Sequence, residues 1–238
     1  MKAPVDIFVQ TPFGKIHALF SVGQKGLMPI VFIPGMLGKA EDWENDLESF
    51  LPRPGLAISL RGRGQSEYPS QGFSIFDHVN DIEAVVNHLK LEKFILVGFS
   101  QGALYATAYA QKFPEKVASL IIQDKVLKQK KFGPEWLMKA LGHPGYQDKK
   151  EFIKGLANES QEINLLKNCQ PIALKPTLIM KGDLSILVTE EDLLEMKEIF
   201  QKSVVAIFPE SGHDVSAPDY DLYIQTINNF IKRYPELT

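Results

Sequence analysis

The feature that most constrains the fold is an alternation of short apolar runs with longer amphipathic stretches along the chain. From the third run onward the segments are mostly continuously apolar, which is typical of parallel strands covered on both faces. Between Ser74 and Leu89, apolar residues recur every three or four positions, which predicts a helix with one buried face. The predicted strands are Asp6–Gln10, Ile16–Val22, Ile30–Ile33, Leu56–Leu60, Phe94–Val97, Ala118–Gln123, Thr177–Met180 and Val204–Phe208.

Two hairpin-like strands followed by alternating strands and helices predict an α/β domain with a mostly parallel sheet of about eight strands. Helices are also predicted at Gly102–Lys112 and Tyr220–Arg233. The alternation lapses over residues 125–175, which we interpret as a helical insertion within a single domain spanning residues 1–238. Its predicted helices are Glu135–Leu141, Lys149–Ala157 and Gln161–Asn168.

Composition excludes several classes of protein. The formal net charge is −3, whereas nucleic-acid-binding proteins usually carry a strongly basic face. No segment approaches the roughly 20 apolar residues that span a bilayer, so a cytoplasmic protein is expected.

The single cysteine, Cys169, cannot form an internal disulfide and is interpreted as a small buried residue. No cluster of metal ligands is evident, and neither metal nor cofactor is expected. The oligomeric state is not indicated.

The most specific motif is Gly98-Phe99-Ser100-Gln101-Gly102, between a predicted buried strand and a predicted helix. This is G-x-S-x-G in the context where it marks a nucleophilic serine on a strained strand-to-helix turn. Larger side chains at positions 98 and 102 would clash in such a turn. The motif predicts Ser100 as the nucleophile.

Backbone amides near Ser100 are candidates for an oxyanion hole. The helix after the turn directs its N-terminus at the reaction centre, so the Gln101 N–H can stabilise an oxyanion. A second donor is expected from the glycine-rich loop Ile33-Pro34-Gly35-Met36-Leu37-Gly38, and Met36 is the candidate.

A general base is required because a neutral hydroxyl is a weak nucleophile. His213 follows the last predicted strand, within Ser211-Gly212-His213, where a loop can bring its imidazole to Ser100. The other histidines, at positions 17, 78, 88 and 143, lack such a context and are interpreted as surface or structural residues.

With these motifs in this order, the sequence resembles the α/β-hydrolase family over nearly its whole length. Besides the blocks around Met36, Ser100 and His213, the segment Ser59-Leu60-Arg61-Gly62-Arg63-Gly64-Gln65-Ser66 is similar to the family's D-x-R-G-x-G-x-S loop. The resemblance implies a three-layer fold, an active site at the carboxyl ends of the strands, and a cap at residues 125–175. Pro34 and Ser59 replace the family's usual His and Asp, at positions that are mainly structural.

The third member of the expected triad is ambiguous. The resemblance places the acid after the seventh strand, but Ser185 stands there, and a hydroxyl carries no negative charge at neutral pH. Asp124 ends the sixth strand, where some members of the family carry their acid. Asp183 lies two residues before the usual place. Asp124, Asp183 and the absence of a third acid all remain open.

The sequence therefore predicts a serine hydrolase that cleaves a small or medium acyl ester through an acyl-enzyme. C–C bond hydrolysis, thioester cleavage and cofactor-free lyase chemistry are alternatives, as is a ligand-binding protein on a degenerate hydrolase scaffold. Apolar residues of the insertion could hold an acyl group or dock the insertion on the core; they are Phe132, Trp136, Leu137, Met138 and Leu141. The eight lysines between Lys125 and Lys154 could steer an anionic substrate or form a solvated face.

Overall fold

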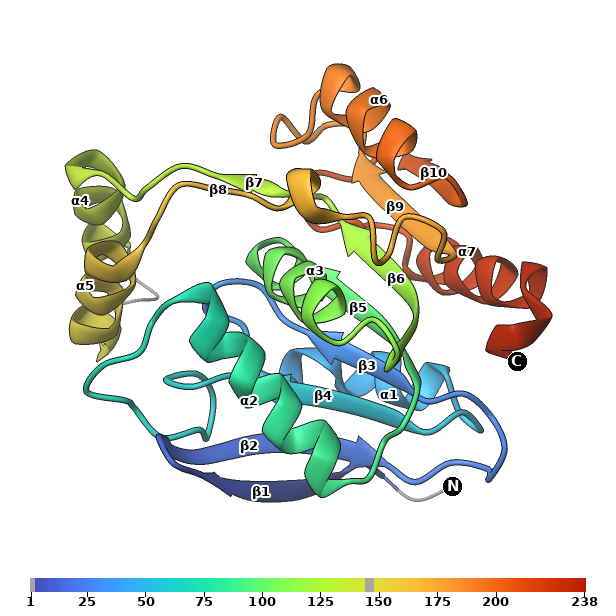
Figure 1. The fold of residues 1–238 in the computed structure, drawn as a ribbon, viewed down its shortest axis with the longest axis horizontal. Helices are drawn as coiled ribbons and strands as arrows, with labels where there is room; N and C mark the ends of the chain where they lie inside the picture. Colours follow the sequence, from blue (N-terminus) through green and yellow to red (C-terminus); the bar gives the residue numbers. More distant parts are fainter. Residues whose placement is uncertain (1–2, 144–147) are drawn as a thin grey trace.

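The computed structural model describes residues 3–143 and 148–238. Residues 1–2 and 144–147, the latter within the predicted insertion, lie outside the described residues. One eight-stranded sheet has the order β1-β2-β4-β3-β5-β6-β9-β10 (Figure 1). Strands β1 and β2 are antiparallel to each other, β2 is antiparallel to β4, and all the other pairs are parallel. The strands are β1 Val5–Thr11, β2 Gly14–Ser21, β3 Ile30–Ile33, β4 Gly55–Ser59, β5 Phe94–Phe99, β6 Val117–Gln123, β9 Thr177–Gly182 and β10 Ser203–Phe208.

Helices cover both faces of this sheet. Helices α2 (Ile75–His88), α3 (Gln101–Lys112) and α6 (Glu190–Ile199) contribute to one apolar core, and α1 (Glu44–Ser49) and α7 (Tyr220–Arg233) contribute to the other. Within β5, Phe94 and Leu96 face the first core while Ile95 and Val97 face the second. This period of two within a continuously apolar run is what a doubly covered strand requires. The predicted three-layer α/β-hydrolase fold is confirmed.

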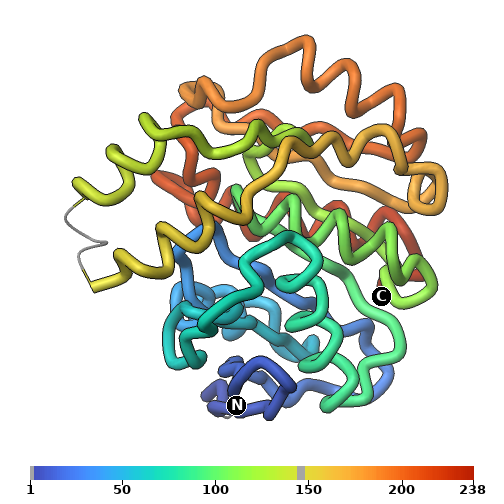
Figure 2. The backbone as a smooth tube through the Cα atoms, turned by 60° about the vertical axis from the view of Figure 1, so that its left-hand side comes forward, coloured from blue at the N-terminus to red at the C-terminus, as the bar shows by residue number. Residues whose placement is uncertain are grey.

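The segment between β6 and β9 leaves the sheet and carries α4 (Pro134–Gly142) and α5 (Lys150–Glu159). Figures 1 and 2 both show these helices side by side at one side of the molecule. Two short strands, β7 (Lys128–Gln129) and β8 (Ile163–Asn164), pair with each other where the segment leaves and rejoins the core. Glu159, at the end of α5, accepts hydrogen bonds from the backbone N–H groups of Gly72 (3.1 Å) and Phe73 (2.9 Å).

The prediction of a helix at Gln161–Asn168 is wrong. Its first part is β8, which pairs with β7, and its second part is the 3-10 turn Leu165–Asn168. The Asn164 side chain accepts from the Leu166 N–H at 3.1 Å, and this cap begins the turn just after the strand. Pairing between β7 and β8 therefore overrides the helical pattern. Further 3-10 segments are Ala40–Trp43 and Pro235–Leu237.

Candidate active site

Ser100 occupies the sharp turn between β5 and α3, with φ 52° and ψ −124°. A non-glycine residue adopts this conformation only where the surrounding structure enforces it. A Cβ at Gly98 would lie 2.6 Å from the Gly102 carbonyl oxygen, and one at Gly102 would lie 2.2 Å from the Ile33 carbonyl oxygen. The two glycines therefore permit β3, the turn and α3 to pack closely and hold Ser100 at the ends of the strands.

Gly102→Ala should destabilise the fold by at least about 2 kcal/mol, because the added methyl meets backbone atoms that cannot rotate away. Urea unfolding would measure the change. Gly133→Ala is the matched control, because a Cβ at Gly133 meets nothing within 4 Å. Equal stability of the two variants would contradict the close packing.

Ser100, His213 and Asp124 form one hydrogen-bonded chain. The Ser100 Oγ lies 2.9 Å from the His213 Nε2, and the His213 Nδ1 lies 2.8 Å from the Asp124 Oδ2. His213 lies in the loop after β10 and its side chain is 39% exposed, whereas Asp124 directly follows β6 and is 0% exposed. Because a carboxylate only accepts hydrogen bonds, it holds the proton on Nδ1 and leaves Nε2 to accept from the serine hydroxyl.

The two candidate acids have different surroundings. Asp183 is exposed and lies in another depression, beside Lys181 and Glu190. Asp124 has a φ of 44°, and its N–H donates to the Met180 carbonyl at 2.8 Å. The chain thus turns sharply at Asp124, beside β9, and among the described residues this carboxylate is the one that hydrogen-bonds to His213.

Ser185, which stands where the family pattern has its acid, contacts the carboxylate of Asp124. Its Oγ donates to the Asp124 Oδ2 at 2.5 Å, and the Gly182 N–H donates to Oδ1 at 3.3 Å. The Leu187 N–H donates to the Ser185 Oγ at 3.3 Å and helps to orient the hydroxyl. Ser185 therefore positions the Asp124 carboxylate, although its own hydroxyl could not serve as the acid. Sequence reasoning missed this role.

Ser185→Ala should lower kcat for an ester roughly tenfold, because a hydrogen bond to a charged group contributes about 1.5–3 kcal/mol. The decrease is limited because Asp124 keeps the Gly182 and His213 donors. Steady-state kinetics would measure it, with Ser185→Thr as a control that retains the hydroxyl. An unchanged kcat in Ser185→Ala would contradict the positioning role.

The loop that carries Met36 lies against the turn at Ser100. A Cβ at Gly35 would lie 3.6 Å from the Ser100 Cβ, and Met36 lines the same cavity as Ser100. Gln101 is the first residue of α3, so its N–H has no carbonyl one turn earlier to bond. Its side-chain Nε2 donates to the Gln129 Oε1 at 2.6 Å, which ties the start of α3 to β7. Both amides therefore remain candidates for the oxyanion hole.

Arg63 is hydrogen-bonded to the loop that carries Met36. The guanidinium is buried, and its Nε donates to the Met36 carbonyl at 2.7 Å. Its Nη1 donates to the Arg61 carbonyl at 2.9 Å and to the His78 Nε2 at 2.5 Å. Burial and the neighbouring Arg63 charge hold the pKa of His78 well below its usual range, so a neutral imidazole accepts from the arginine. The sequence motif contained Arg63 without indicating this support.

Ser59, which replaces the family's usual Asp, has a structural role. The Ser59 Oγ accepts from the Ala40 N–H at 2.8 Å and lies 3.2 Å from the Nδ1 of the buried His17. His88 is exposed. Cys169 is buried, and its thiol donates to the Leu165 carbonyl at 3.3 Å.

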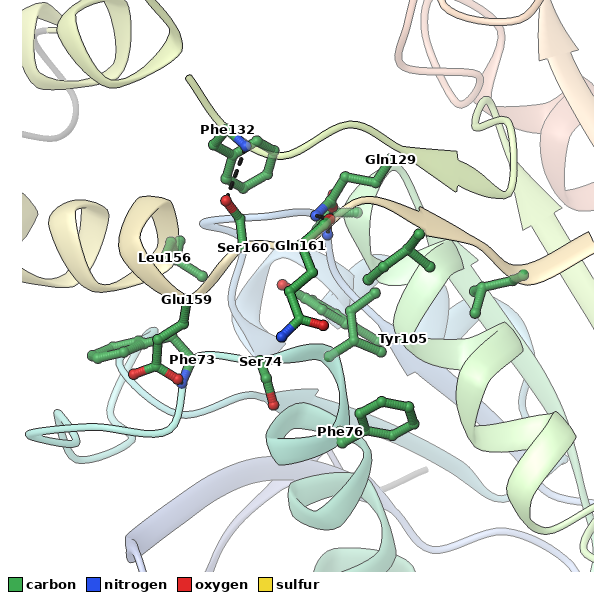
Figure 3. Close-up of a pocket in the computed structure, with 14 residues that line it drawn as sticks. Phe73, Ser74, Phe76, Tyr105, Gln129, Phe132, Leu156, Glu159, Ser160 and Gln161 are labelled. Atoms are coloured by element: carbon green, nitrogen blue, oxygen red, sulfur yellow. Dashed lines mark hydrogen bonds between the residues drawn. The ribbon is translucent and has the colours of Figure 1, made fainter. Parts of the chain in front are cut away.

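Two cavities flank the turn at Ser100. The larger, about 530 Å³, is lined by Ser100 and His213 together with Met36, Trp43, Asp46 and neighbouring residues of several loops and helices. The smaller, about 80 Å³, is lined by residues of α2, α3 and the segment between β6 and β9; Figure 3 shows Phe73, Phe76, Tyr105 and Phe132 around it. Phe132 thus reaches this cavity, whereas Trp136 packs against the buried Phe73, Phe152 and Leu156, and Met138 is exposed. No lysine or arginine of the described residues lines the larger cavity.

Asp46 is the unusual residue of the larger cavity. Its side chain is buried, and its Oδ1 has no hydrogen-bond partner within the described part of the chain. Burial raises the pKa of Asp46 to about 7, the nearby Asp214 charge adds to the rise, and the Tyr223 hydroxyl opposes it. Sequence reasoning missed this residue, because an aspartate after Trp43 resembles the solvent-exposed acids beside it.

Asp46→Asn should become more stable relative to the wild type as the pH rises from 5 to 8. The pKa of Asp46 is higher in the folded than in the unfolded chain, so the stability from its protonated form is lost as pH rises from 3.8 to about 7. The expected gain of the variant is at most about 3 kcal/mol between pH 5 and 8. Urea unfolding of both proteins would measure it, and a difference independent of pH would contradict the burial of this carboxyl.

Comparison with known proteins shows to which family the chain belongs. The family described as "alpha/beta hydrolase fold" matches residues 28–150, more than half of the chain. The chain therefore belongs to the alpha/beta hydrolase fold family. Among solved structures, an alpha/beta hydrolase enzyme from a Medee basin deep-sea metagenome library superposes with a TM-score of 0.80 at 16% identity, covering 96% of this chain and 98% of that one.

Similar proteins have diverse names. The 2-(acetamidomethylene)succinate hydrolase of Mesorhizobium japonicum is 23% identical over 215 residues, covering 74% of this chain and 77% of that protein. The proline iminopeptidase of Arabidopsis thaliana is 34% identical over 153 residues, covering 61% of this chain and 40% of that protein. The chain spans less than half the length of several of the curated relatives that it matches.

Two further features bear on partners. None of the described helices is long and apolar enough to cross a membrane. Within residues 3–143 and 148–238, no group of three or more histidine, cysteine, aspartate or glutamate side chains could hold a metal ion.

Proposed function

We propose that this protein is a serine hydrolase that cleaves a small or medium acyl ester through an acyl-enzyme. The observation that carries the proposal is the hydrogen-bonded chain from Ser100 through His213 to the buried Asp124. A serine whose proton can pass to a positioned imidazole is an activated nucleophile, and the buried carboxylate stabilises the imidazolium that results.

In the first half of the reaction, the Ser100 Oγ attacks the ester carbonyl carbon while its proton moves to the His213 Nε2. The Met36 and Gln101 amides stabilise the oxyanion of the tetrahedral intermediate. The carbon–oxygen bond to the alcohol then breaks, and His213 donates the proton to the leaving alkoxide. In the second half, His213 takes a proton from water, which attacks the acyl carbon, and the acid leaves as the proton returns to Ser100.

The same residues could act on other acyl compounds, and the relatives named above favour an acyl–nitrogen bond as the second candidate. Turnover of p-nitrophenyl butyrate should therefore be compared with that of butyryl p-nitroanilide, a butyryl thioester and a β-diketone. Samples quenched in acid during turnover should show a mass increase of one butyryl group.

Sustained ester turnover with this adduct is the expected result. Preference for the anilide, thioester or diketone would overturn the ester assignment. A single adduct without turnover would instead support the ligand-binding alternative.

A further inference from the structure

Arg63 is a buried cation without an ion-pair partner. Only 1% of its surface is exposed, and none of the described carboxylates lies within ion-pair distance of its guanidinium. Its neighbour Arg61 differs, because it pairs with the buried Asp81 at 2.7 Å. Burying an unpaired charge is costly unless hydrogen bonds satisfy its donors. The groups that Arg63 bonds instead indicate its role.

Contacts from three helices hold the guanidinium in one position. Its Nη1 donates to the His78 Nε2 at 2.5 Å, and its Nη2 donates to the Tyr105 hydroxyl at 3.3 Å. The His78 Nδ1 lies 2.6 Å from the Ser74 carbonyl, so this nitrogen carries the proton and Nε2 is left as an acceptor. The Phe152 ring covers the guanidinium at 4.6 Å. Helices α2, α3 and α5 therefore fix the direction of the remaining donor, Nε.

That remaining donor bonds the central peptide of the turn that carries Met36. The turn spans Gly35 to Gly38 and is closed by a hydrogen bond from the Gly38 N–H to the Gly35 carbonyl at 3.2 Å. Met36 and Leu37 are its central residues, and the Arg63 Nε donates to the Met36 carbonyl at 2.7 Å. The central peptide is the part of a β-turn that rotates when one turn type converts into another. The bond from Arg63 opposes this rotation.

The direction of the Met36 carbonyl matters for the oxyanion hole. Met36 and Leu37 line the larger cavity with Ser100, whereas Arg63 does not line it. Neither the Met36 N–H nor the Leu37 N–H donates a hydrogen bond within the described part of the chain, so both remain available to a ligand. The C=O and N–H of one planar trans peptide point in opposite directions. A rotated peptide would turn the carbonyl oxygen away from Arg63, and an oxygen aimed at the cavity would repel an oxyanion.

We propose that Arg63 is a positioning residue that holds the Met36 carbonyl away from the reacting oxygen, so that the turn presents N–H groups to the oxyanion. Because no carboxylate cancels its charge, the buried guanidinium also favours negative charge nearby. The inference rests on the proposed function, because it assigns a role in stabilising the tetrahedral intermediate. Binding of a planar, uncharged carbonyl compound should depend on Arg63 much less than binding of a tetrahedral anion.

The test compares a ligand that resembles the tetrahedral anion with one that resembles the substrate. Butylboronic acid reacts with an activated serine: the Ser100 Oγ bonds to boron, its proton moves to His213, and the boron becomes a tetrahedral anion. Butyranilide is a neutral planar amide, and its binding is measured in the Ser100→Ala background, where no acyl-enzyme can form. Titration calorimetry gives the dissociation constant of each ligand.

Arg63→Gln should bind butylboronic acid at least about tenfold more weakly than the wild type. It should also lower kcat for p-nitrophenyl butyrate about thirtyfold, less than the loss of an oxyanion donor itself would. Its affinity for butyranilide should change less than about twofold. Arg63→Lys keeps the charge but lacks the planar fork of donors, so it should show a smaller loss, again confined to the boronic acid. This second variant carries the test if Arg63→Gln does not fold.

The matched control is Arg53→Gln, which removes another buried guanidinium. The Arg53 Nη1 donates to the Met28 carbonyl and, at 3.0 Å, to the Leu237 carbonyl. Arg53 lies just before β4, at the opposite end of the parallel strands from Ser100. This variant should lose stability but keep the wild-type kcat and boronic-acid affinity. Equal losses in Arg53→Gln and Arg63→Gln, or equal losses for the two ligands in Arg63→Gln, would overturn the proposal.

The boronic-acid comparison needs no ester turnover, and this separates the inference from the proposed function. If the wild type hydrolyses the ester and both Arg63 variants match it in kcat and boronic-acid affinity, the inference fails alone. If no ester is hydrolysed but the boronic acid binds and loses affinity as predicted in the Arg63 variants, the ester assignment fails and the role of Arg63 stands. If the boronic acid binds the wild type no more tightly than Ser100→Ala, both fail.

Discussion

The Ser100→Ala variant is expected to hydrolyse p-nitrophenyl butyrate about a millionfold more slowly than the wild type. Without the Oγ, no acyl-enzyme forms, and what remains is the oxyanion donors and substrate binding acting on water. The fold should be retained, because alanine is smaller than serine and the turn is shaped by Gly98 and Gly102. Single-turnover kinetics at high enzyme concentration would measure the residual rate.

Ser70→Ala is the matched control, because Ser70 is exposed in the loop before α2. It should retain the wild-type rate. If Ser100→Ala kept more than one per cent of the activity while folded, a different nucleophile or direct attack by water would have to be considered.

The second large effect is expected from Asp124→Asn, which should lower kcat about ten-thousandfold. An asparagine that donates its NH₂ group to Nδ1 would favour the tautomer with the proton on Nε2, which cannot accept the proton of Ser100. The change is nearly isosteric, so the buried turn after β6 should survive. Pre-steady-state measurement of the butyryl adduct would show that acylation itself is slowed.

Asp183→Asn is the comparison, because Asp183 was the other candidate from sequence and is exposed. We expect it to change kcat less than twofold. An inactive Asp183→Asn beside an active Asp124→Asn would reverse the assignment and require the β9 loop to rearrange in solution.

Much of the fold could be predicted because each sheet strand is locally specified. The apolar run at Ile30–Ile33 is β3 as predicted, and the C-terminal helix has the predicted bounds Tyr220–Arg233. These elements bury most of their apolar side chains, so their sequences show the burial directly.

Elements with little buried surface were harder to predict. Helix α6 was not predicted, because only Leu193 and Met196 are buried along it. Its reciprocal cap between Thr189 and Asp192 was the signal that could have indicated it. The pair β7–β8 depends on residues far apart in the chain, which no local pattern reveals.

The distinction between features specified by local sequence and features that depend on distant segments also holds for the site. The turn at Ser100 is local, and its glycines indicate it. The choice between Asp124 and Asp183 depends on how the loop after β9 folds back, and Ser185 contributes to that through its bond to Asp124. Asp46 of α1 and Tyr223 of α7 line the same cavity, and the sequence around Asp46 does not encode this approach of two distant segments.

Covalent labelling tests most directly whether Ser100 is an activated nucleophile. The folded wild type should be incubated with a fluorophosphonate, and the modified residue located by peptide mass spectrometry. We expect one adduct, at Ser100, which is absent in Ser100→Ala and forms far more slowly in Asp124→Asn. A folded wild type that remains unlabelled, or is labelled at another residue, would contradict this expectation.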